Sequence, residues 1–229
     1  MDNTVSMKLP VILVNFKNYK ESTNSNSLKL AEICDSVSKE FGVNISVSPS
    51  YSDIKEIKDK TTVPIFSQHI DPIENAGAYT GAVVAENLKE IGIAGSLLNH
   101  SERKMDLKNI EKCIGILRKL NLVSVCCASD LEEVGKIAKL GPDFISIEPP
   151  ELIGTGVSVS TTRPEVVTKT IEIVKGINPK INVLCGAGVA NGQDVRKAIE
   201  LGTCGVLVSS RVVKAEDQRK ILLELAKSL

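Results

Sequence analysis

Residues 123–147 read V-S-V-C-C-A-S-D-L-E-E-V-G-K-I-A-K-L-G-P-D-F-I-S-I and hold two short apolar runs with a longer segment between them. The runs are Val123–Cys126 and Phe144–Ile147, and nearly continuous apolar character of this kind is typical of parallel strands covered on both faces. Leu131–Leu140 lies between them and has the length of a helix. The stretch therefore predicts a strand, a helix and a second parallel strand in succession.

The same alternation of short apolar runs and longer helical patterns extends over the whole chain. No Pro/Ser-rich linker or low-complexity tract divides it, so we expect one domain over residues 1–229. Eight strand–helix units favour a closed (β/α)8 barrel of the α/β class, with a doubly wound open sheet as the rival fold. The other six runs are Val11–Val14, Ile45–Val47, Val63–Phe66, Gly95–Leu98, Ile181–Leu184 and Gly205–Val208.

Several intervening segments carry helix start and stop signals. A helical stripe runs from Leu28 to Phe41 and is followed by Gly42, a common helix terminator. Pro164 stands where a first helical turn would begin, and Asn191–Leu201 starts with a capping type of residue. Ala215–Ser228 predicts a final amphipathic helix.

Composition narrows the function classes. The 229 residues include 28 basic and 28 acidic side chains, and aromatic residues make up only 3%, with no Trp. This balance offers neither the basic footprint nor the stacking surface of a nucleic-acid-binding protein. No apolar run reaches the length of a membrane span, and Met1–Lys8 carries no apolar signal core. We expect a soluble cytoplasmic protein that binds neither nucleic acid nor membrane.

The six cysteines form no recognisable metal or redox pattern. There is no C-x-x-C pair, the spacings match no zinc motif, and only two histidines could assist. We therefore expect no metal site, and thiols that are reduced and mostly buried, as in a reducing cytosol. They are Cys34, Cys113, Cys126, Cys127, Cys185 and Cys204.

Chemistry in a barrel of this class lies at the carboxyl ends of the strands. Lys17 follows the first run by two residues, and its ammonium group could attract a phosphate or a developing oxyanion at the barrel mouth. His100 follows the fourth run near the expected start of a helical segment, whose positive end disfavours imidazolium and favours a neutral donor. Taken singly, each could equally be a surface or structural residue.

A carboxylate and a loop with contrasting ends follow the sixth run. Glu148 closes this apolar run, Pro149 and Pro150 stiffen one end of the loop, and Gly154–Gly156 supplies backbone freedom at the other. This composition suits a lid that closes over a site, although a simple turn with an exposed Glu would also fit.

Small residues follow the last two runs, as Gly186-Ala187-Gly188 and Ser209-Ser210-Arg211. Their backbone N–H groups could face a phosphate at adjacent strand ends, whereas either motif alone is more simply a turn. Together, the strand ends offer a cation, a neutral electrophile, a carboxylate base, a lid and a phosphate cradle. The sequence contains no nucleotide fingerprint or nucleophile elbow.

Four motifs resemble the triosephosphate isomerase family over essentially the whole chain: Asn15–Lys17, Gly77–Gly81, Asn99–Arg103 and Glu148–Gly156. The similarity is greatest to the compact branch of the family known from archaea, which carries a lid of the P-P-E-L-I-G-T-G kind. The resemblance implies a TIM barrel that interconverts dihydroxyacetone phosphate and D-glyceraldehyde 3-phosphate without a cofactor, in glycolysis and gluconeogenesis.

The resemblance also implies a role for each matching residue. Glu148 is the base that moves a proton between C1 and C2, and neutral His100 polarises the substrate oxygens. Lys17, assisted by Asn15, holds the substrate and stabilises negative charge, and Glu102 orients Lys17 and His100. The implied substrate-binding set is Asn15, Phe16, Lys17, Ile153, Gly154, Gly188, Ser209 and Ser210.

The chain departs from the common family pattern at three places. Glu151 stands where many relatives have a lid tryptophan, Gly188 lacks the hydroxyl of a Y-G-G-S stretch, and Ser209-Ser210 replaces two glycines. The contacts that would close the lid are therefore open at this stage.

The resemblance implies a homo-oligomer, either a homodimer or a homotetramer. Ala76–Gly81 matches the loop that inserts beside the partner's active site in relatives, and Leu107–Leu120 and Leu131–Leu140 match helices that pair dimers.

Two other functions fit a phosphate-binding barrel. A Schiff-base aldolase needs a buried lysine within a strand, and the eight runs contain none. A sugar-phosphate-binding barrel without activity would not need Asn15, Lys17, His100 and Glu148 together.

Overall fold

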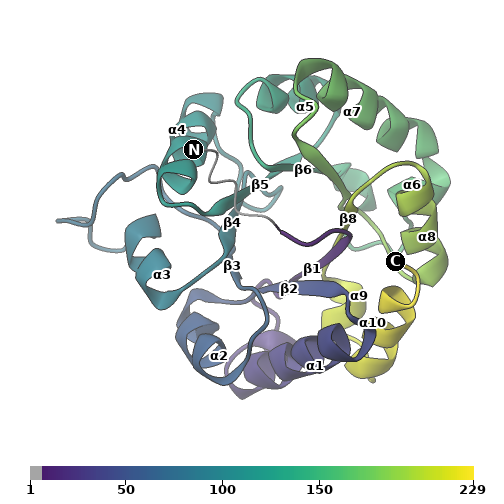
Figure 1. Ribbon diagram of the computed structural model, residues 1–229, viewed down its shortest axis with the longest axis horizontal. Helices are drawn as coiled ribbons and strands as arrows, with labels where there is room; N and C mark the ends of the chain where they lie inside the picture. The colour runs from purple at the N-terminus through teal and green to yellow at the C-terminus, as the bar shows by residue number, and fades with distance from the viewer. Residues whose placement is uncertain (1–6) are drawn as a thin grey trace.

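The computed structural model describes residues 7–229, in which eight parallel strands form a ring enclosed by helices (Figure 1). The expectation for Met1–Lys8 falls largely on residues 1–6, which lie outside the described part. The strands are β1 Val11–Asn15, β2 Asn44–Ser48, β3 Phe66–Ser67, β4 Gly95–Leu98, β5 Val123–Ala128, β6 Phe144–Ile147, β7 Asn182–Cys185 and β8 Gly205–Val208.

Helices occupy the connections between strands. Three short 3-10 turns, Lys20–Ser22, Tyr51–Asp53 and Pro150–Leu152, accompany them. The helices are α1 Ser25–Phe41, α2 Ile54–Lys60, α3 Ala85–Ile91, α4 Leu107–Lys119, α5 Leu131–Ala138, α6 Val159–Thr162, α7 Pro164–Ile177, α8 Gly192–Glu200, α9 Ser210–Val213 and α10 Gln218–Ala226. None of the helices that the structure describes has the length and apolar character needed to cross a membrane.

Strand pairing confirms the barrel and excludes the open sheet. The order is β2-β1-β8-β7-β6-β5-β4-β3, so the first and last strands of the chain lie side by side. A parallel bridge between Val47 and Ile65 links the two ends of this order and closes the ring. The resulting single-domain (β/α)8 barrel brings all the strand ends to one mouth.

The third strand is shorter than predicted. The run Val63–Phe66 was expected to be a strand, but β3 comprises only Phe66 and Ser67, preceded by the bridge at Ile65. Pro64 has no N–H to donate to a ladder, although its carbonyl accepts the N–H of Val47 at 2.9 Å. Apolar character alone therefore placed this strand too early in the chain.

Helix boundaries agree with the sequence signals at α7 and α8 but not at the end of the chain. Pro164 opens α7, and the Asn191 side chain accepts the Asp194 N–H to cap α8. The single helix predicted over Ala215–Ser228 is wrong at its start, because α10 begins only after Asp217, whose side chain accepts the N–H of Lys220. The short α9 precedes it.

Alternation along each strand divides the core into two layers. On β1, Ile12 and Val14 pack toward the helices, whereas Val11 and Leu13 belong to a separate cluster inside the ring. The buried members of the inner cluster are Val11, Leu13, Phe66, Leu97, Val123, Val125, Cys127, Phe144, Leu184 and Leu207. All six cysteines are free, and all but Cys204 are buried, as expected.

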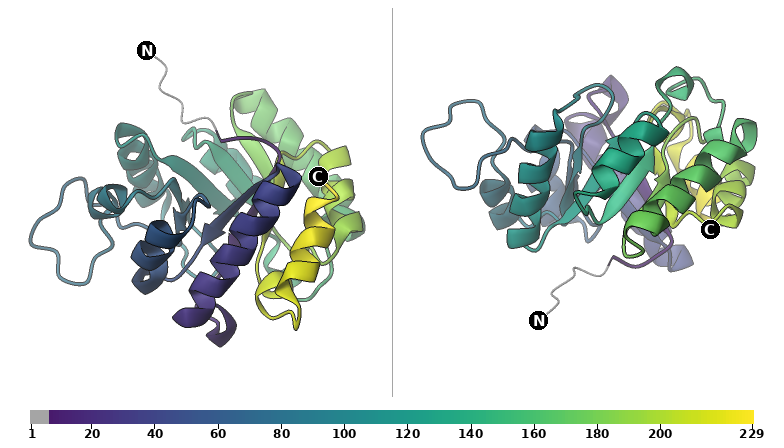
Figure 2. Two further views of the ribbon diagram at one scale, coloured as in Figure 1. Left: turned by 60° about the horizontal axis from the view of Figure 1, so that its bottom comes forward. Right: turned by 90° about the horizontal axis from the view of Figure 1, so that it is seen from above.

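One segment departs from the barrel outline. The connection between β3 and α3 projects from the wall as a long loop, visible at the left of Figures 1 and 2. Tyr79 near its tip is 52% exposed, which is high for a large aromatic side chain.

The inner layer should not tolerate added volume at Gly95. A Cβ atom there would lie 2.3 Å from the Val123 carbonyl oxygen and 2.5 Å from the Phe66 ring. We expect Gly95→Ala to lower the free energy of unfolding by about 1–3 kcal/mol or more, and Gly176→Ala, whose Cβ meets no atom within 4 Å, to leave it unchanged or slightly higher. Urea denaturation of both variants at one protein concentration tests this, and equal midpoints would contradict it.

Candidate active site

A cavity of about 190 Å³ lies at the carboxyl ends of the strands. All the predicted site residues except Phe16 line it, so the structure brings together residues from five separate stretches of sequence. The lining residues are Asn15, Lys17, Tyr19, His100, Glu102, Glu148, Ile153, Gly154, Gly156, Gly186, Gly188, Val189, Leu207, Val208, Ser209, Ser210 and Arg211.

The Phe16 side chain does not reach this cavity. It is completely buried in the layer between strands and helices, because it points to the opposite side of the chain from Asn15. The membership of Phe16 in the substrate-binding set stays a prediction, and its side chain packs in the core behind Asn15 and Lys17.

Strand alternation carries Asn15 and Glu148 into the barrel mouth. Asn15 continues the inward phase of Val11 and Leu13, and Glu148 continues that of Phe144. The Glu148 side chain is 3% exposed, and its Oε1 has no hydrogen-bond partner among the described residues. An unpaired, buried carboxylate oxygen at a cavity is well placed to accept a proton.

Lys17 is held in a left-handed backbone conformation, with φ of 51°. Asn15 Oδ1 accepts its N–H at 3.0 Å, and Gln68 Nε2 donates to its carbonyl at 2.8 Å. The Nζ atom lies 2.6 Å from Glu102 Oε1. A strained backbone that is fixed on both sides is typical of a functional position.

A second left-handed residue, Asn99, brings His100 to the cavity. Leu97 points into the ring, so plain alternation would turn Asn99 inward and His100 outward. The φ of 57° at Asn99 reverses this, and His100 lines the cavity with 9% of its surface exposed. The turn His100–Arg103 follows, closed by the Arg103 N–H donating to the His100 carbonyl at 2.8 Å.

The neutral tautomer of His100 follows from one backbone hydrogen bond. The Glu102 N–H donates to His100 Nδ1 at 3.2 Å, so Nδ1 is the acceptor and Nε2 carries the proton. His100 Nε2 lies 3.4 Å from Glu148 Oε2. The expected cause was wrong: α4 begins only at Leu107, so a local amide, and not a helix end, holds the ring.

Two glycines, Gly186 and Gly188, allow the loop after β7 to pack closely against Glu148 and Val157. A Cβ atom on Gly186 would lie 2.2 Å from Ser146 Oγ and 2.5 Å from Glu148 Cγ. At Gly188, with φ of 71°, a Cβ atom would lie 1.9 Å from the Val157 carbonyl oxygen. Both positions therefore require glycine.

The two ends of the predicted lid, residues 149–156, differ in backbone conformation. Pro150–Leu152 forms a 3-10 turn, and Gly154 and Gly156 both have φ of 75°. Glu151, which stands in place of a lid tryptophan, pairs with Arg163 beside the start of α7.

Some lining residues lie outside the implied set of site residues, notably Tyr19, Gly186 and Arg211, although Gly186 and Arg211 belong to the motifs that follow the last two runs. Arg211 Nε donates to the Ala190 carbonyl at 2.6 Å and so bridges the loops after β7 and β8. Its place directly after Ser209-Ser210 was the available signal. Among residues 7–229, no group of three or more His, Cys, Asp or Glu side chains could hold a metal ion.

Comparison with known proteins identifies the family. The family model described as triosephosphate isomerase matches residues 10–227. The chain belongs to the triosephosphate isomerase family. It is 50% identical to the triosephosphate isomerase of Methanothermus fervidus, covering 96% of this chain and 98% of the relative. The enzyme of Methanobacterium bryantii is 46% identical, covering 96% of this chain and 97% of its own, and that of Methanothermobacter thermautotrophicus is 44% identical, covering 94% of each.

These relatives come from methanogenic archaea, which confirms the expected resemblance to the archaeal branch. Family membership makes this chain an isomerase with a triose phosphate as its substrate. The cavity at the barrel mouth is therefore the candidate site for this isomerisation.

The His100 ring should carry its proton on Nε2 and none on Nδ1, because Nδ1 accepts the Glu102 N–H. Nitrogen-15 NMR of the imidazole reports this directly. His69 is the only other histidine, so a His69→Gln variant leaves one ring to assign. A ring with protons on both nitrogens, or on Nδ1 alone, would contradict the tautomer.

Proposed function

We propose that this chain interconverts dihydroxyacetone phosphate and D-glyceraldehyde 3-phosphate by proton transfer through an enediol or enediolate intermediate, as a step of glycolysis and gluconeogenesis. The supporting observation is the buried Glu148 carboxylate with a free Oε1, beside His100 Nε2 in the same cavity as Lys17. The reaction needs no cofactor, because the substrate carbonyl already acidifies the neighbouring C–H bond.

Glu148 acts as the general base. Its carboxylate takes the proton from C1, and the C–H electron pair forms the C1–C2 double bond while negative charge moves to the C2 oxygen. His100 gives its Nε2 proton to the C2 oxygen and takes the hydroxyl proton from the C1 oxygen. The protonated Glu148 then returns its proton to C2, and the C1–O bond becomes the carbonyl of the aldehyde. These transfers occur in a site from which water is excluded.

His100 and Lys17 stabilise the charge that develops on the oxygens. The Nε2–H group of His100 points into the cavity and donates to the C1 and C2 oxygens in turn. Lys17, with Asn15 beside it, places positive charge near the same atoms, and Glu102 orients both Lys17 and His100.

The phosphate is held by backbone amides at Gly154, Gly188, Ser209 and Ser210, where the lid and the ends of β7 and β8 meet. Ile153 lies over the substrate when the lid closes. Closure protects the intermediate, since an enediolate next to a phosphate ester can otherwise expel phosphate.

The strand residues favour this reaction over the rival barrel chemistry. A Schiff-base aldolase needs a lysine on a strand, and none of the eight described strands contains one. A barrel that only binds sugar phosphates does not require a buried carboxylate with an unpaired oxygen, as Glu148 has.

Replacing the base tests the proposal. Glu148→Gln keeps the size of the side chain, but its amide cannot accept the proton, so we expect turnover to fall by at least about 10²–10⁴-fold with the fold retained. Glu165→Gln, on the exposed face of α7, is the matched control and should keep full activity. A coupled assay with each triose phosphate measures this, and near-normal turnover in Glu148→Gln would refute the assignment.

We further propose a homo-oligomer, with the loop Ala76–Gly81 as the contact that completes the site. The supporting observations are its projection from the barrel and the exposed ring of Tyr79. The α4 side chains Cys113, Ile116 and Leu117 are buried in the subunit core. An apolar contact of α4 with a second dimer in a homotetramer would therefore use the exposed Leu107. The six free thiols support a location in the cytoplasm.

Thr80→Arg should weaken the assembly and the activity together, because a desolvated charge at the loop tip disfavours insertion into a partner. Light scattering with size-exclusion chromatography measures the mass, against 24.6 kDa for one chain. Lys169→Arg, on the outer surface of α7, controls for the added side chain. A parent protein that is fully active as a single chain would refute the oligomer, and a dimer would refute only the homotetramer.

A further inference from the structure

The position of His100 depends on the residue before it. Asn99 tolerates a left-handed backbone better than most residues, but surrounding contacts must still hold it there. Its side chain is buried and fully engaged: Nδ2 donates to the Cys127 carbonyl at 2.9 Å and to Glu133 Oε1 at 2.8 Å. Its Oδ1 accepts the Met105 N–H at 2.9 Å.

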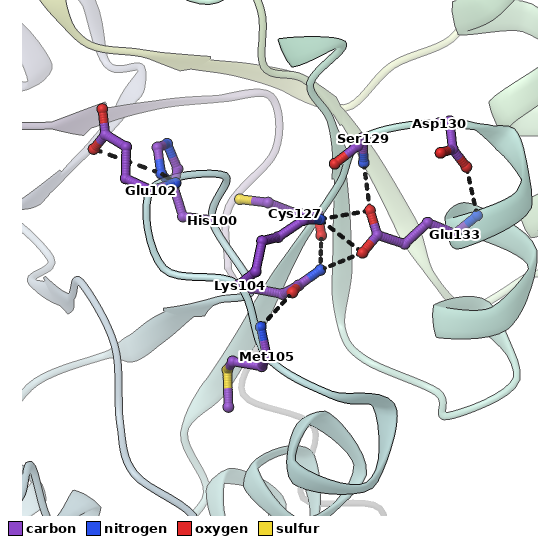
Figure 3. Close-up of polar contacts among 9 residues, drawn as sticks. His100, Glu102, Lys104, Met105, Cys127, Ser129, Asp130 and Glu133 are labelled. Carbon is purple, nitrogen blue, oxygen red and sulfur yellow. Dashed lines mark hydrogen bonds and ion pairs between the residues drawn. The ribbon is translucent and has the colours of Figure 1, made fainter.

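Glu133, on α5, is the hub of these contacts (Figure 3). Lys104 Nζ lies 2.7 Å from both of its carboxylate oxygens, and the Ser129 N–H donates to Oε2 at 2.7 Å. Burial alone would raise the pKa of Glu133, but the hydrogen bonds from Lys104, Ser129 and Asn99 lower it below its usual value. The carboxylate therefore remains ionised at neutral pH.

The network closes the catalytic turn at both ends. Residues 99–105 leave β4, carry His100 and Glu102 over the barrel mouth, and return beside their starting point. Glu133 binds Asn99 at the start of the turn and Lys104 near its end. A single carboxylate from the neighbouring strand–helix unit thus fixes the segment that carries both catalytic side chains.

Helix capping does not account for this arrangement. Asp130 already caps α5 by accepting the Glu133 N–H at 2.8 Å, and the Glu133 side chain turns away toward the β4 turn. We propose that Glu133 is a positioning residue for the isomerase, which acts through Asn99 on the placement of His100. This inference rests on the proposed function.

Glu133→Gln tests the inference because the carboxylate accepts from three groups and an amide has only one acceptor oxygen. The amide nitrogen of the variant must face Asn99, Lys104 or the Ser129 N–H, so the turn loses at least one contact. We expect kcat to fall by about 10–100-fold while KM changes by less than about twofold, because substrate binding depends mainly on other residues.

Two controls separate positioning from stability. Glu132→Gln removes the adjacent charge, which pairs only with Lys136 on the same helix in the described structure, and should keep normal kcat. Asp130→Ala removes the helix cap and should lower the melting temperature with little change in kcat. A loss of kcat in Asp130→Ala equal to that in Glu133→Gln would overturn the proposal.

A double-mutant cycle with Asn99→Gly tests the path of the effect. Glycine accepts the backbone angle but has no side chain for Glu133 to hold, so Asn99→Gly should lower kcat by itself. Glu133→Gln should then add less than about a twofold loss, and full multiplication of the two effects would overturn action through Asn99. If Glu133→Gln does not fold, Asn99→Gly carries the test: a normal kcat overturns the proposal.

The experiments distinguish failure of the proposed role of Glu133 from failure of the proposed function. A parent protein that does not isomerise triose phosphates contradicts the proposed function. An active parent with Glu133→Gln at parental kcat contradicts only the role of Glu133.

Discussion

Side-chain alternation in a closed ring of parallel strands limits which residues can reach the cavity. On β1 and β6 the inward phase leads directly to Asn15 and Glu148. On β4 the same phase would point His100 into the helix layer, so the chain must break it at Asn99. The pairing of Glu148 with His100 in the cavity therefore depends on one regular strand end and one left-handed residue.

The turn after β4 also organises the charges of the site. Its backbone N–H at Glu102 sets the tautomer of His100, and the Glu102 carboxylate lies 2.6 Å from Lys17 Nζ. The Lys17–Glu102 pair leaves little net charge on that side of the cavity before substrate arrives. In the proposed reaction, the substrate phosphate and the enediolate would bring negative charge next to the Lys17 ammonium and the backbone amides.

Local pattern was sufficient to predict most of the fold, and the family resemblance added the set of residues that line the cavity. Buried parallel strands are continuous apolar runs, and a carboxylate at the end of such a run, as at Glu148, stands out against them. The start of β3 was misplaced because Pro64 removes a ladder donor from an otherwise apolar run. The bridge from Arg211 to Ala190 and the burial of the Phe16 side chain depend on contacts between segments far apart in sequence, which local pattern does not contain.

The glycines after β7 explain why this chain can lack the hydroxyl that many relatives carry there. Gly188 lies so close to the Val157 carbonyl that even a methyl group would collide, and Gly186 is packed in the same way against Glu148. Direct backbone packing of Gly188 against Val157 thus takes the place of a side-chain contact between the loop after β7 and the end of the lid. The same loop thus contacts Glu148 on one side and the Val157 segment on the other, and it also lines the cavity. Direct contact with the stretch Cys185–Gly188 therefore helps to set the position of both Glu148 and the chain around Val157.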